Sequence, residues 1–437
     1  MNGMLSEIKK LKPLSKAYFI VMVLLVCSIV INNAMNSICI MMLLAVWLVE
    51  RGFGCKWKQL LREPFFILNA LSLVLYAISI GISHDKGSAI FFFTKNLSLI
   101  IIPTVLLSGR EFNKAQINLI LKAFILCVFI AMSIESLLSL IQYFETHDRS
   151  FFFYHKLVGS IDIGGAIIAS FFCMTSMVFL FYLPDKGRLK WFLYAAFGVW
   201  IILLNSKMFL ATLLLLFLIN GFSLLTTRVK IVSILIIASG VLFLSVINNP
   251  IKQRFMDMSH FQKSYLTAST FNPDMYFDGL SLRVIYIRFG LEIMRENGNY
   301  LIGVGSGDAE NLLKKKIASY NMYTGDGVTE KEGYLKYGYH NEYLQRLVQF
   351  GFAGFSLFMA AIVYCFYMAI KYKQKLLLSL MIIFSSSFFT DTLIEHQVGL
   401  VSFLVFSCLC IIIIRDDQIK RQANMERYSA TDFIKAL

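Results

Sequence analysis

The sequence contains little charge and little proline. Only 16% of its 437 residues are charged and six are proline, whereas 57% are hydrophobic and the mean hydropathy is +0.67. A soluble globular protein is about a quarter charged, so this composition excludes a soluble globular enzyme. The 40 phenylalanines also exclude a disordered chain, which is poor in aromatic residues. The composition therefore predicts an integral membrane protein.

The sequence lacks the cysteine and histidine spacings that bind metals. The long polar segment 248–341 contains no cysteine, so the sequence predicts neither a disulfide framework nor a thiolate metal site there. The six histidines show no HExxH or HxH spacing. We therefore predict no metal site and no bound cofactor.

Long apolar runs dominate the rest of the chain. A membrane-spanning helix needs about 20 mostly apolar residues, and the runs lack the two-residue alternation of a membrane β-barrel. The sequence therefore predicts an all-α protein with about twelve transmembrane helices. Their expected ranges are 17–31, 34–49, 64–82, 88–107, 116–143, 162–183, 191–204, 208–225, 229–247, 343–369, 376–389 and 398–414.

The net charge of +14 follows from where the basic residues lie. Lysine and arginine gather in alternate short connections, starting with the N-terminal segment and ending with the C-terminal tail, which indicates the cytoplasmic side. The opposite connections and helix ends hold few of them, namely Lys86, Lys95, Arg149, Lys156 and Lys207. This bias predicts a multi-pass protein with both termini in the cytoplasm. It also accounts for the charge without nucleic acid, so we predict no nucleic-acid partner.

Four regions follow from this topology. Residues 1–247 form the first nine transmembrane helices, and residues 248–341 form one large outer loop domain. Residues 342–414 form the last three transmembrane helices, and residues 415–437 form a cytoplasmic tail. A loop as long as 248–341 in a compact protein is usually functional, so we expect the functional residues there.

Arginines on an expected helix at 280–296 are the first candidates. Arg288 and Glu292 are four residues apart and share a solvated face with Arg295. Arg283 instead shares its stripe with Ile287, so its charge is expected to point toward the protein. An inward arginine needs an anionic partner, and both a structural ion pair and an anion-binding site satisfy that need.

Two further motifs follow in the same loop. The sequence GVGSGD at 303–308 places Gly303 and Gly305 in a turn that can cradle a phosphate, although glycine-rich turns after helices are also common. His340 directly precedes the tenth expected span. The positive end of a helix disfavours a protonated imidazole, so a neutral general base and a hydrogen-bonded structural histidine both fit.

The motifs of this loop, taken together, resemble the O-antigen ligase/polymerase superfamily of bacterial surface-polysaccharide assembly. The resemblance rests on twelve spans with one large outer loop before the tenth, on Arg283 in the helix leading into LIGVGSGD at 301–308, and on HNEYLQ at 340–345. It is motif-specific over about 280–358 and architectural elsewhere. It implies a fold similar to type C glycosyltransferases (GT-C-like), with the loop domain in the periplasm.

The resemblance implies an O-antigen ligase in lipopolysaccharide biosynthesis. Such an enzyme moves a glycan from undecaprenyl diphosphate to a hydroxyl of lipid A-core at the periplasmic face of the bacterial inner membrane. It needs no metal, and direct displacement inverts the anomeric centre. His340 and Arg283 would be catalytic. The residues expected at the donor diphosphate are Arg283, Lys207, Gly303 and Gly305, and the candidate substrate-binding residues are Arg288, Tyr343, Gln345 and Glu395.

Two alternatives remain open from the sequence. A Wzy-type polymerase of O-antigen or capsular polysaccharide would use the same donor motif with another acceptor. A transporter of lipid or polysaccharide would instead carry several buried charges on broken helices at mid-membrane. The basic residues singled out above lie at the outer surface, which favours an enzyme.

Overall fold

The computed structural model describes residues 12–50, 52–109, 112–161, 164–184, 187–221, 262–325 and 333–436. Within these ranges the chain is helical and contains no strand, which confirms the all-α class. The first half of the chain forms α2 (Pro13–Ile31), α3 (Asn33–Val49), α4 (Phe53–Leu60), α5 (Pro64–Ile82), α6 (Lys86–Lys95), α7 (Ser98–Ser108), α8 (Lys114–Thr146), η1 (Arg149–Phe152), α9 (Tyr154–Leu157) and α10 (Gly165–Tyr182).

The second half contains the last bundle helices and the helices of the segment that was predicted to form the outer loop. It forms α11 (Arg188–Leu204), α12 (Lys207–Leu216), η2 (Phe217–Gly221), η5 (Lys263–Leu266), α15 (Gly279–Asn297), α16 (Ala309–Ser319), η6 (Gly333–Lys336), α17 (Glu342–Lys371), α18 (Lys375–Thr390), η7 (Leu393–Glu395) and α19 (Gln397–Ala436).

Among the residues that the structure describes, seven stretches are long and apolar enough to cross a membrane, which agrees with a multi-pass membrane protein. They are α2, α5, the run Lys86–Ser108, α8, α10, α17 and the part of α19 up to Gln422. Three shorter apolar helices, α3, α12 with its extension, and α18, accompany them. Every predicted range except 229–247 is covered wholly or partly by a helix. That range lies outside the described residues, so the count of twelve spans stays a prediction.

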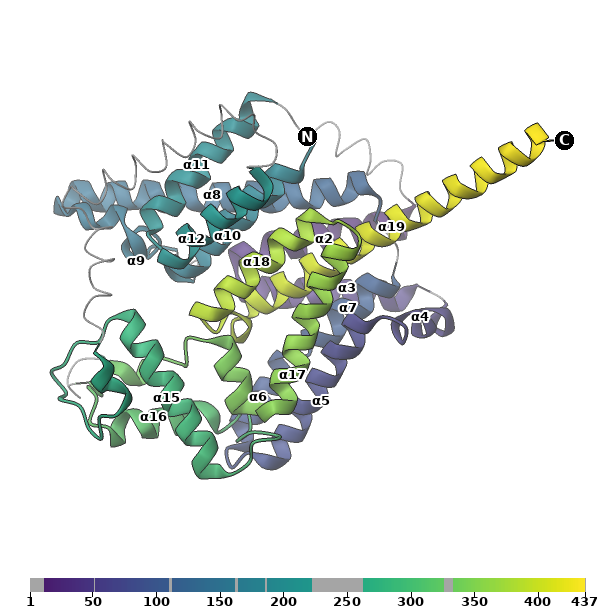
Figure 1. The fold of residues 1–437 in the computed structure, drawn as a ribbon. Helices are drawn as coiled ribbons and strands as arrows, with labels where there is room; N and C mark the ends of the chain where they lie inside the picture. Colours follow the sequence, from purple (N-terminus) through teal and green to yellow (C-terminus); the bar gives the residue numbers. More distant parts are fainter. Residues whose placement is uncertain are drawn as a thin grey trace.

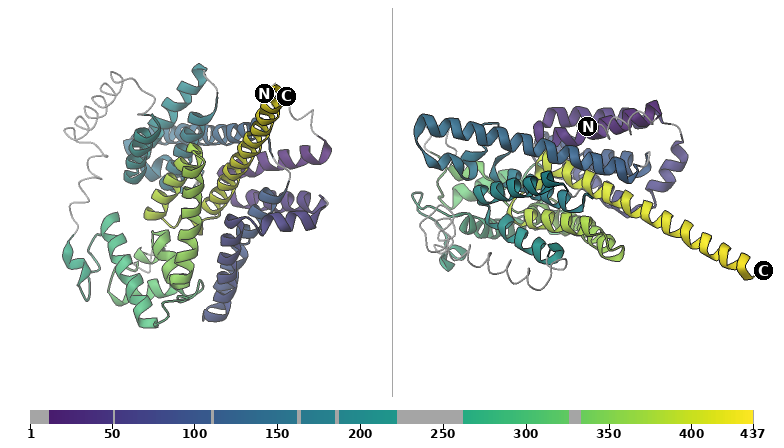
Figure 2. Two further views of the ribbon diagram at one scale, coloured as in Figure 1. Left: turned by 45° about the vertical axis from the view of Figure 1, so that its right-hand side comes forward. Right: turned by 90° about the horizontal axis from the view of Figure 1, so that it is seen from above.

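Helices α15 and α16 and the C-terminal helix α19 lie at opposite sides of the molecule (Figure 1). Helices α15 and α16 pack against each other and against the beginning of α17, whereas α19 extends far beyond the bundle (Figures 1 and 2). In the bundle, α17 packs against α5 and α18, and α18 also contacts α10 and α12. This arrangement brings α15, α17 and the end of α18 together.

Helix α17 is broken at Gly351, where the outer loop inserts. Gly351 has φ +61° and ψ −159°, so the helical hydrogen bonds around it are interrupted. The loop replaces them: Val304 and Gly305 donate N–H bonds to the carbonyls of Val348 and Gln349, at 3.0 and 2.9 Å. In return, the N–H groups that follow Gly351 donate to the carbonyls of residues 300 and 301. We call this four-bond junction the α17 bracket.

Gly351→Ala should disrupt the α17 bracket. A Cβ atom at this position would overlap the backbone of Leu301, and the positive φ adds about 1–3 kcal/mol of strain. We expect the variant to have a clearly lower thermal unfolding midpoint in detergent. Gly198→Ala in α11 is the matched control, since a Cβ there meets no atom within 4 Å. Equal midpoints for the two variants would contradict the bracket's contribution to stability.

A partly buried ion-pair cluster joins four helices at the predicted cytoplasmic end. Glu63, which is 7% exposed, pairs with Arg415 of α19 and accepts a hydrogen bond of 2.9 Å from Tyr364 of α17. Arg415 also donates to the Leu107 carbonyl of α7 at 3.0 Å. We call these residues the Glu63 cluster. On α17, Tyr364 lies beyond the break at Gly351, whereas Arg346 lies before it.

Candidate active site

His340 is held in place by its two neighbours in the chain. The buried hydroxyl of Tyr339 donates to the Ala309 carbonyl at 2.9 Å, which fixes the residue to the start of α16. Asn341 caps α17 by accepting the Leu344 N–H at 3.0 Å. His340 lies between these anchors with φ +48° and a side chain that is 28% exposed. The imidazole is thus fixed at the start of a helix and still accessible.

Asp391 is the partner of His340. Its Oδ1 lies 3.4 Å from Nδ1 of His340, and it also accepts the Thr392 N–H at 2.8 Å. Burial acts to raise the pKa of Asp391, but the hydrogen bond from His340 and the nearby imidazoles outweigh burial and leave the pKa below its ordinary value. An Nδ1–H group that donates to this carboxylate leaves Nε2 as a proton acceptor. The pair therefore has the geometry of an oriented general base.

Sequence reasoning missed Asp391. It follows the last residue of α18, within the short segment between two spans, and belongs to no motif that was singled out. The one available signal was an acidic residue at the outer end of an expected span. Only the fold brings it to His340, 51 residues earlier in the chain.

Arg283 reaches the same turn from α15. Its Nε and Nη2 atoms donate to the Thr390 carbonyl at 3.1 and 2.7 Å, and Nη1 donates to the Gly279 carbonyl at 2.7 Å. The predicted inward direction of Arg283 is therefore confirmed. Burial lowers its pKa, an effect that Asp391 opposes, and a guanidinium stays charged despite such a shift. Arg283 and His340 thus meet at the adjacent residues Thr390 and Asp391.

The guanidinium of Arg283 retains capacity for a ligand. A guanidinium has five N–H groups, and three of those of Arg283 donate to the two carbonyls above. The other two have no acceptor among the residues that the structure describes. Because the bonded carbonyls are neutral, the positive charge of Arg283 is not cancelled by a direct ion pair in that part of the chain. Such a fixed cation suits an anionic phosphate oxygen.

Lys207 is the first residue of α12, after Ser206 at the cap. Helix α12 packs against α18, the helix that ends beside Asp391. The helix start carries partial positive charge, to which the lysine adds. The structure thus places Lys207 on a helix that packs against α18, and its role at a diphosphate stays a prediction.

The loop with Gly303 and Gly305 packs tightly against the bundle. A Cβ at Gly303 would lie 2.5 Å from the Val348 carbonyl oxygen, so close approach to α17 requires glycine. The N–H groups of Gly303 and Gly305 donate to the carbonyls of Asn299 and Gln349. Those of residues 306 and 307 donate to the hydroxyls of Ser79 and Ser83 in and after α5, at 2.6 and 3.2 Å. These bonds favour a packing role over the predicted phosphate cradle.

Arg288 organises the loop domain. Its predicted ion pair with Glu292 is confirmed at 2.8 Å, but the pair is not solvated, since the side chains are 15% and 19% exposed. Arg288 also donates to the carbonyls of Tyr265 and Ala268 and to the hydroxyl of Tyr320. The reason for the difference is that Tyr320 covers the guanidinium, 4.9 Å from its ring centre. These contacts stabilise the domain, and a substrate contact by Arg288 stays a prediction.

The other three candidate substrate-binding residues lie in the helix packing. Tyr343 donates its hydroxyl to the Ser385 carbonyl of α18 at 3.3 Å. Gln345 is 1% exposed, and Glu395 is 7% exposed and lies 3.4 Å from Arg346. Binding by these residues stays a prediction. Arg346, a buried arginine that sequence reasoning did not single out, is the centre of this polar region.

A comparison with protein families matches the segment that contains most of the candidate site residues. Residues 192–359 match the family model described as O-Antigen ligase. The match confirms the resemblance to the O-antigen ligase/polymerase superfamily. The matched segment contains Lys207, Arg283 and His340, whereas Asp391 lies beyond it. No curated protein matches the chain.

Proposed function

We propose that the chain is an O-antigen ligase of lipopolysaccharide biosynthesis. It would transfer a glycan from undecaprenyl diphosphate to a hydroxyl of lipid A-core at the periplasmic face of the bacterial inner membrane, with both termini in the cytoplasm. The observation that carries the proposal is the meeting of His340, Asp391 and Arg283 at the outer end of α18. The match of 192–359 to the O-antigen ligase model supports the choice of reaction.

In the proposed reaction, His340 Nε2 takes the proton of the acceptor hydroxyl while the hydroxyl oxygen attacks the anomeric carbon. The bond from that carbon to the diphosphate oxygen breaks, and its electron pair leaves with the diphosphate. Arg283, together with Lys207, stabilises the negative charge that develops there. Asp391 keeps the imidazole oriented and stabilises its protonated form. A single displacement inverts the anomeric centre.

A reconstituted assay tests this function. The purified full chain is incubated with a synthetic polyprenyl-diphosphate glycan and lipid A-core, and the expected product is glycosylated lipid A-core with inverted anomeric configuration. A product with retained configuration would exclude single displacement. A deletion strain distinguishes the related polymerase: unattached polymer indicates a ligase, whereas single repeat units on the core indicate a polymerase.

The transporter alternative makes a different prediction. It requires movement of the lipid-linked glycan across the membrane without cleavage of the sugar–diphosphate bond. Release of polyprenyl diphosphate in the reconstituted assay would therefore exclude transport as the sole activity. If donor is translocated in vesicles and never cleaved, the ligase proposal fails.

Transfer should be independent of divalent metal ions. In the described parts of the chain, no group of three or more His, Cys, Asp or Glu side chains is arranged to hold a metal, and the cation beside the candidate base is Arg283. We expect the rate to be unchanged within about twofold after treatment with EDTA, measured in the reconstituted assay. Added Mg²⁺ or Mn²⁺ should not increase it. Loss of activity with EDTA and recovery on adding a metal would contradict the proposed chemistry.

A further inference from the structure

A stripe of buried polar side chains runs along the outer half of α17. Glu342, Gln345, Arg346 and Gln349 follow the i, i+3, i+4, i+7 spacing of one helix face, and their exposures are 0%, 1%, 6% and 0%. Polar and charged groups in a membrane helix are costly to bury and mark functional sites by default. Neither the proposed base nor the proposed diphosphate contact uses them.

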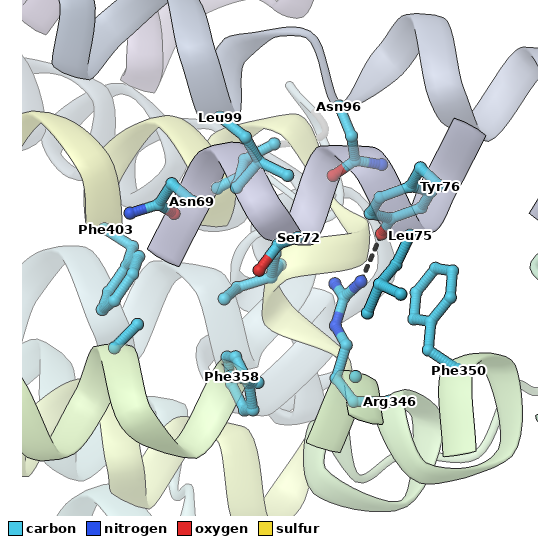
Figure 3. A pocket seen from close by; sticks show the side chains of 14 residues that line it. Asn69, Ser72, Leu75, Tyr76, Asn96, Leu99, Arg346, Phe350, Phe358 and Phe403 are labelled. Atoms are coloured by element: carbon cyan, nitrogen blue, oxygen red, sulfur yellow. Dashed lines mark hydrogen bonds between the residues drawn. The ribbon is translucent and has the colours of Figure 1, made fainter. Parts of the chain in front are cut away.

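Arg346 is the centre of this stripe. Its Nε donates to Glu342 Oε1 at 2.7 Å, and its Nη2 lies 2.6 Å from the same oxygen. Glu395 lies on its other side, at 3.4 Å from Nη2. Nη1 donates to the hydroxyl of Tyr76 on α5, beside a mostly apolar pocket (Figure 3). We call Glu342, Arg346, Glu395 and Tyr76 the Arg346 cluster.

One carboxylate of the cluster belongs to the segment that carries His340, and the other belongs to the segment that carries its partner Asp391. Glu342 begins α17 directly after His340 and Asn341. Glu395 belongs to the short connection 391–396, which begins with Asp391. Glu342 Oε2 also accepts the Ile394 N–H of that connection at 3.0 Å. The cluster therefore joins the segment that carries the imidazole to the segment that carries its partner.

We infer that Arg346 is a positioning residue, which acts through Glu342 and Glu395 to hold Asp391 against His340. The inference rests on the proposed function. The contact between His340 and Asp391 is a single interaction of 3.4 Å between two chain segments, so it depends on what fixes the segments. A misplacement of about 1 Å in such a site can reduce a rate by about 10²-fold.

The Glu63 cluster provides a matched comparison within the chain. It also contains arginine, glutamate and tyrosine side chains, although with one glutamate instead of two, and its Glu63 is buried between helices. It lies near the other end of α17, and it contains no residue adjacent to His340 or Asp391. A purely structural role for buried ion pairs would make the two clusters equivalent in their effect on the reaction.

The test replaces each cluster by neutral residues. The triple variant E342Q/R346M/E395Q leaves no unpaired charge, and such neutral replacements of buried ion pairs often preserve stability. We expect it to accumulate in the membrane like the wild type but to show a kcat about 10²-fold lower, with a smaller change in KM. The control E63Q/R415M should retain kcat at equal protein amount.

Three further readouts separate positioning from stability. The acid side of the pH–rate profile should move to lower pH in the triple variant, because Asp391 is then held less closely against the imidazole and stabilises its protonated form less. Among the described residues, His396 and Arg283 also act on Asp391 electrostatically. The single variant E395Q should shift the profile in the same direction, which keeps the test decisive if the triple variant does not fold. The effects of E395Q and D391N on kcat should be less than additive.

Two results would overturn the inference. One is a triple variant, or E395Q if the triple variant does not fold, with the wild-type kcat and pH profile. The other is full additivity of E395Q and D391N. Failure of the proposed function is a separate result, because the wild-type protein itself would then release no polyprenyl diphosphate from the synthetic donor.

Discussion

Replacement of His340 by alanine is expected to reduce glycan transfer by about 10²–10⁴-fold, the range typical of a lost general base. The reason is that Nε2 of this imidazole is the proton acceptor of the proposed reaction, with Nδ1 directed at Asp391. The reconstituted assay measures the loss at equal protein amount. His340→Ala should also abolish the acid limb of the pH–rate profile that protonation of the base produces.

His84→Ala is the matched control for this variant. His84 is an exposed histidine in the connection after α5, and only its backbone N–H contacts Asp308. We expect it to retain wild-type activity. In the wild type, the pKa of Asp391 lies below its ordinary value. The carboxylate therefore stays ionised as the pH falls toward 5, and it becomes protonated only when the pH falls below the ordinary pKa of an aspartate. A His340→Ala variant with full activity would exclude the proposed base.

Replacement of Arg283 by alanine is expected to have the second large effect on the rate of transfer. Removal of one preorganised donor to a developing negative charge typically costs about 3–4 kcal/mol, or roughly 10²–10³-fold in rate. Arg283→Lys should recover only part of this loss, because lysine keeps the charge but cannot grip Thr390 with two N–H groups and face the diphosphate as well. The measurement is kcat with the polyprenyl-diphosphate donor.

Arg295 offers the control on the same helix. It is exposed near the C-terminal end of α15, far along the helix from the Thr390 contact. Arg295→Ala should leave kcat unchanged and test whether loss of any α15 arginine impairs the enzyme. If Arg283→Ala and Arg295→Ala have equal, small effects, Arg283 does not stabilise the leaving group.

The fold class was accessible from the sequence because lipid selects helices that are apolar on all sides. Each predicted range within the described residues is covered at least partly by a helix, and Arg283 points inward as its helix position predicted, although Ile287 of the same stripe is exposed. These features are local. Each depends on residues within a few turns of one another, so no knowledge of the tertiary arrangement was needed.

The contacts of the site were less accessible because they join distant segments. Asp391 and Arg346 have no local pattern that indicates their partners, and only the packing of α17 against α5 and α18 makes them neighbours of His340 and Tyr76. For Gly303 and Gly305 the local pattern was present but misleading, because glycines in such a turn suit a phosphate loop. In the structure, the break at Gly351 frees the Gln349 carbonyl for the Gly305 N–H, and the Gly303 N–H donates to the Asn299 carbonyl.

The α17 bracket has a mechanical consequence. The loop domain and α17 share the backbone hydrogen bonds of the α17 bracket. A hinge motion of the domain at this point would therefore have to break those bonds, which join it to the helix that follows His340. We therefore expect a lipid-borne donor of the proposed reaction to approach along another flank, away from the junction between α17 and the loop domain.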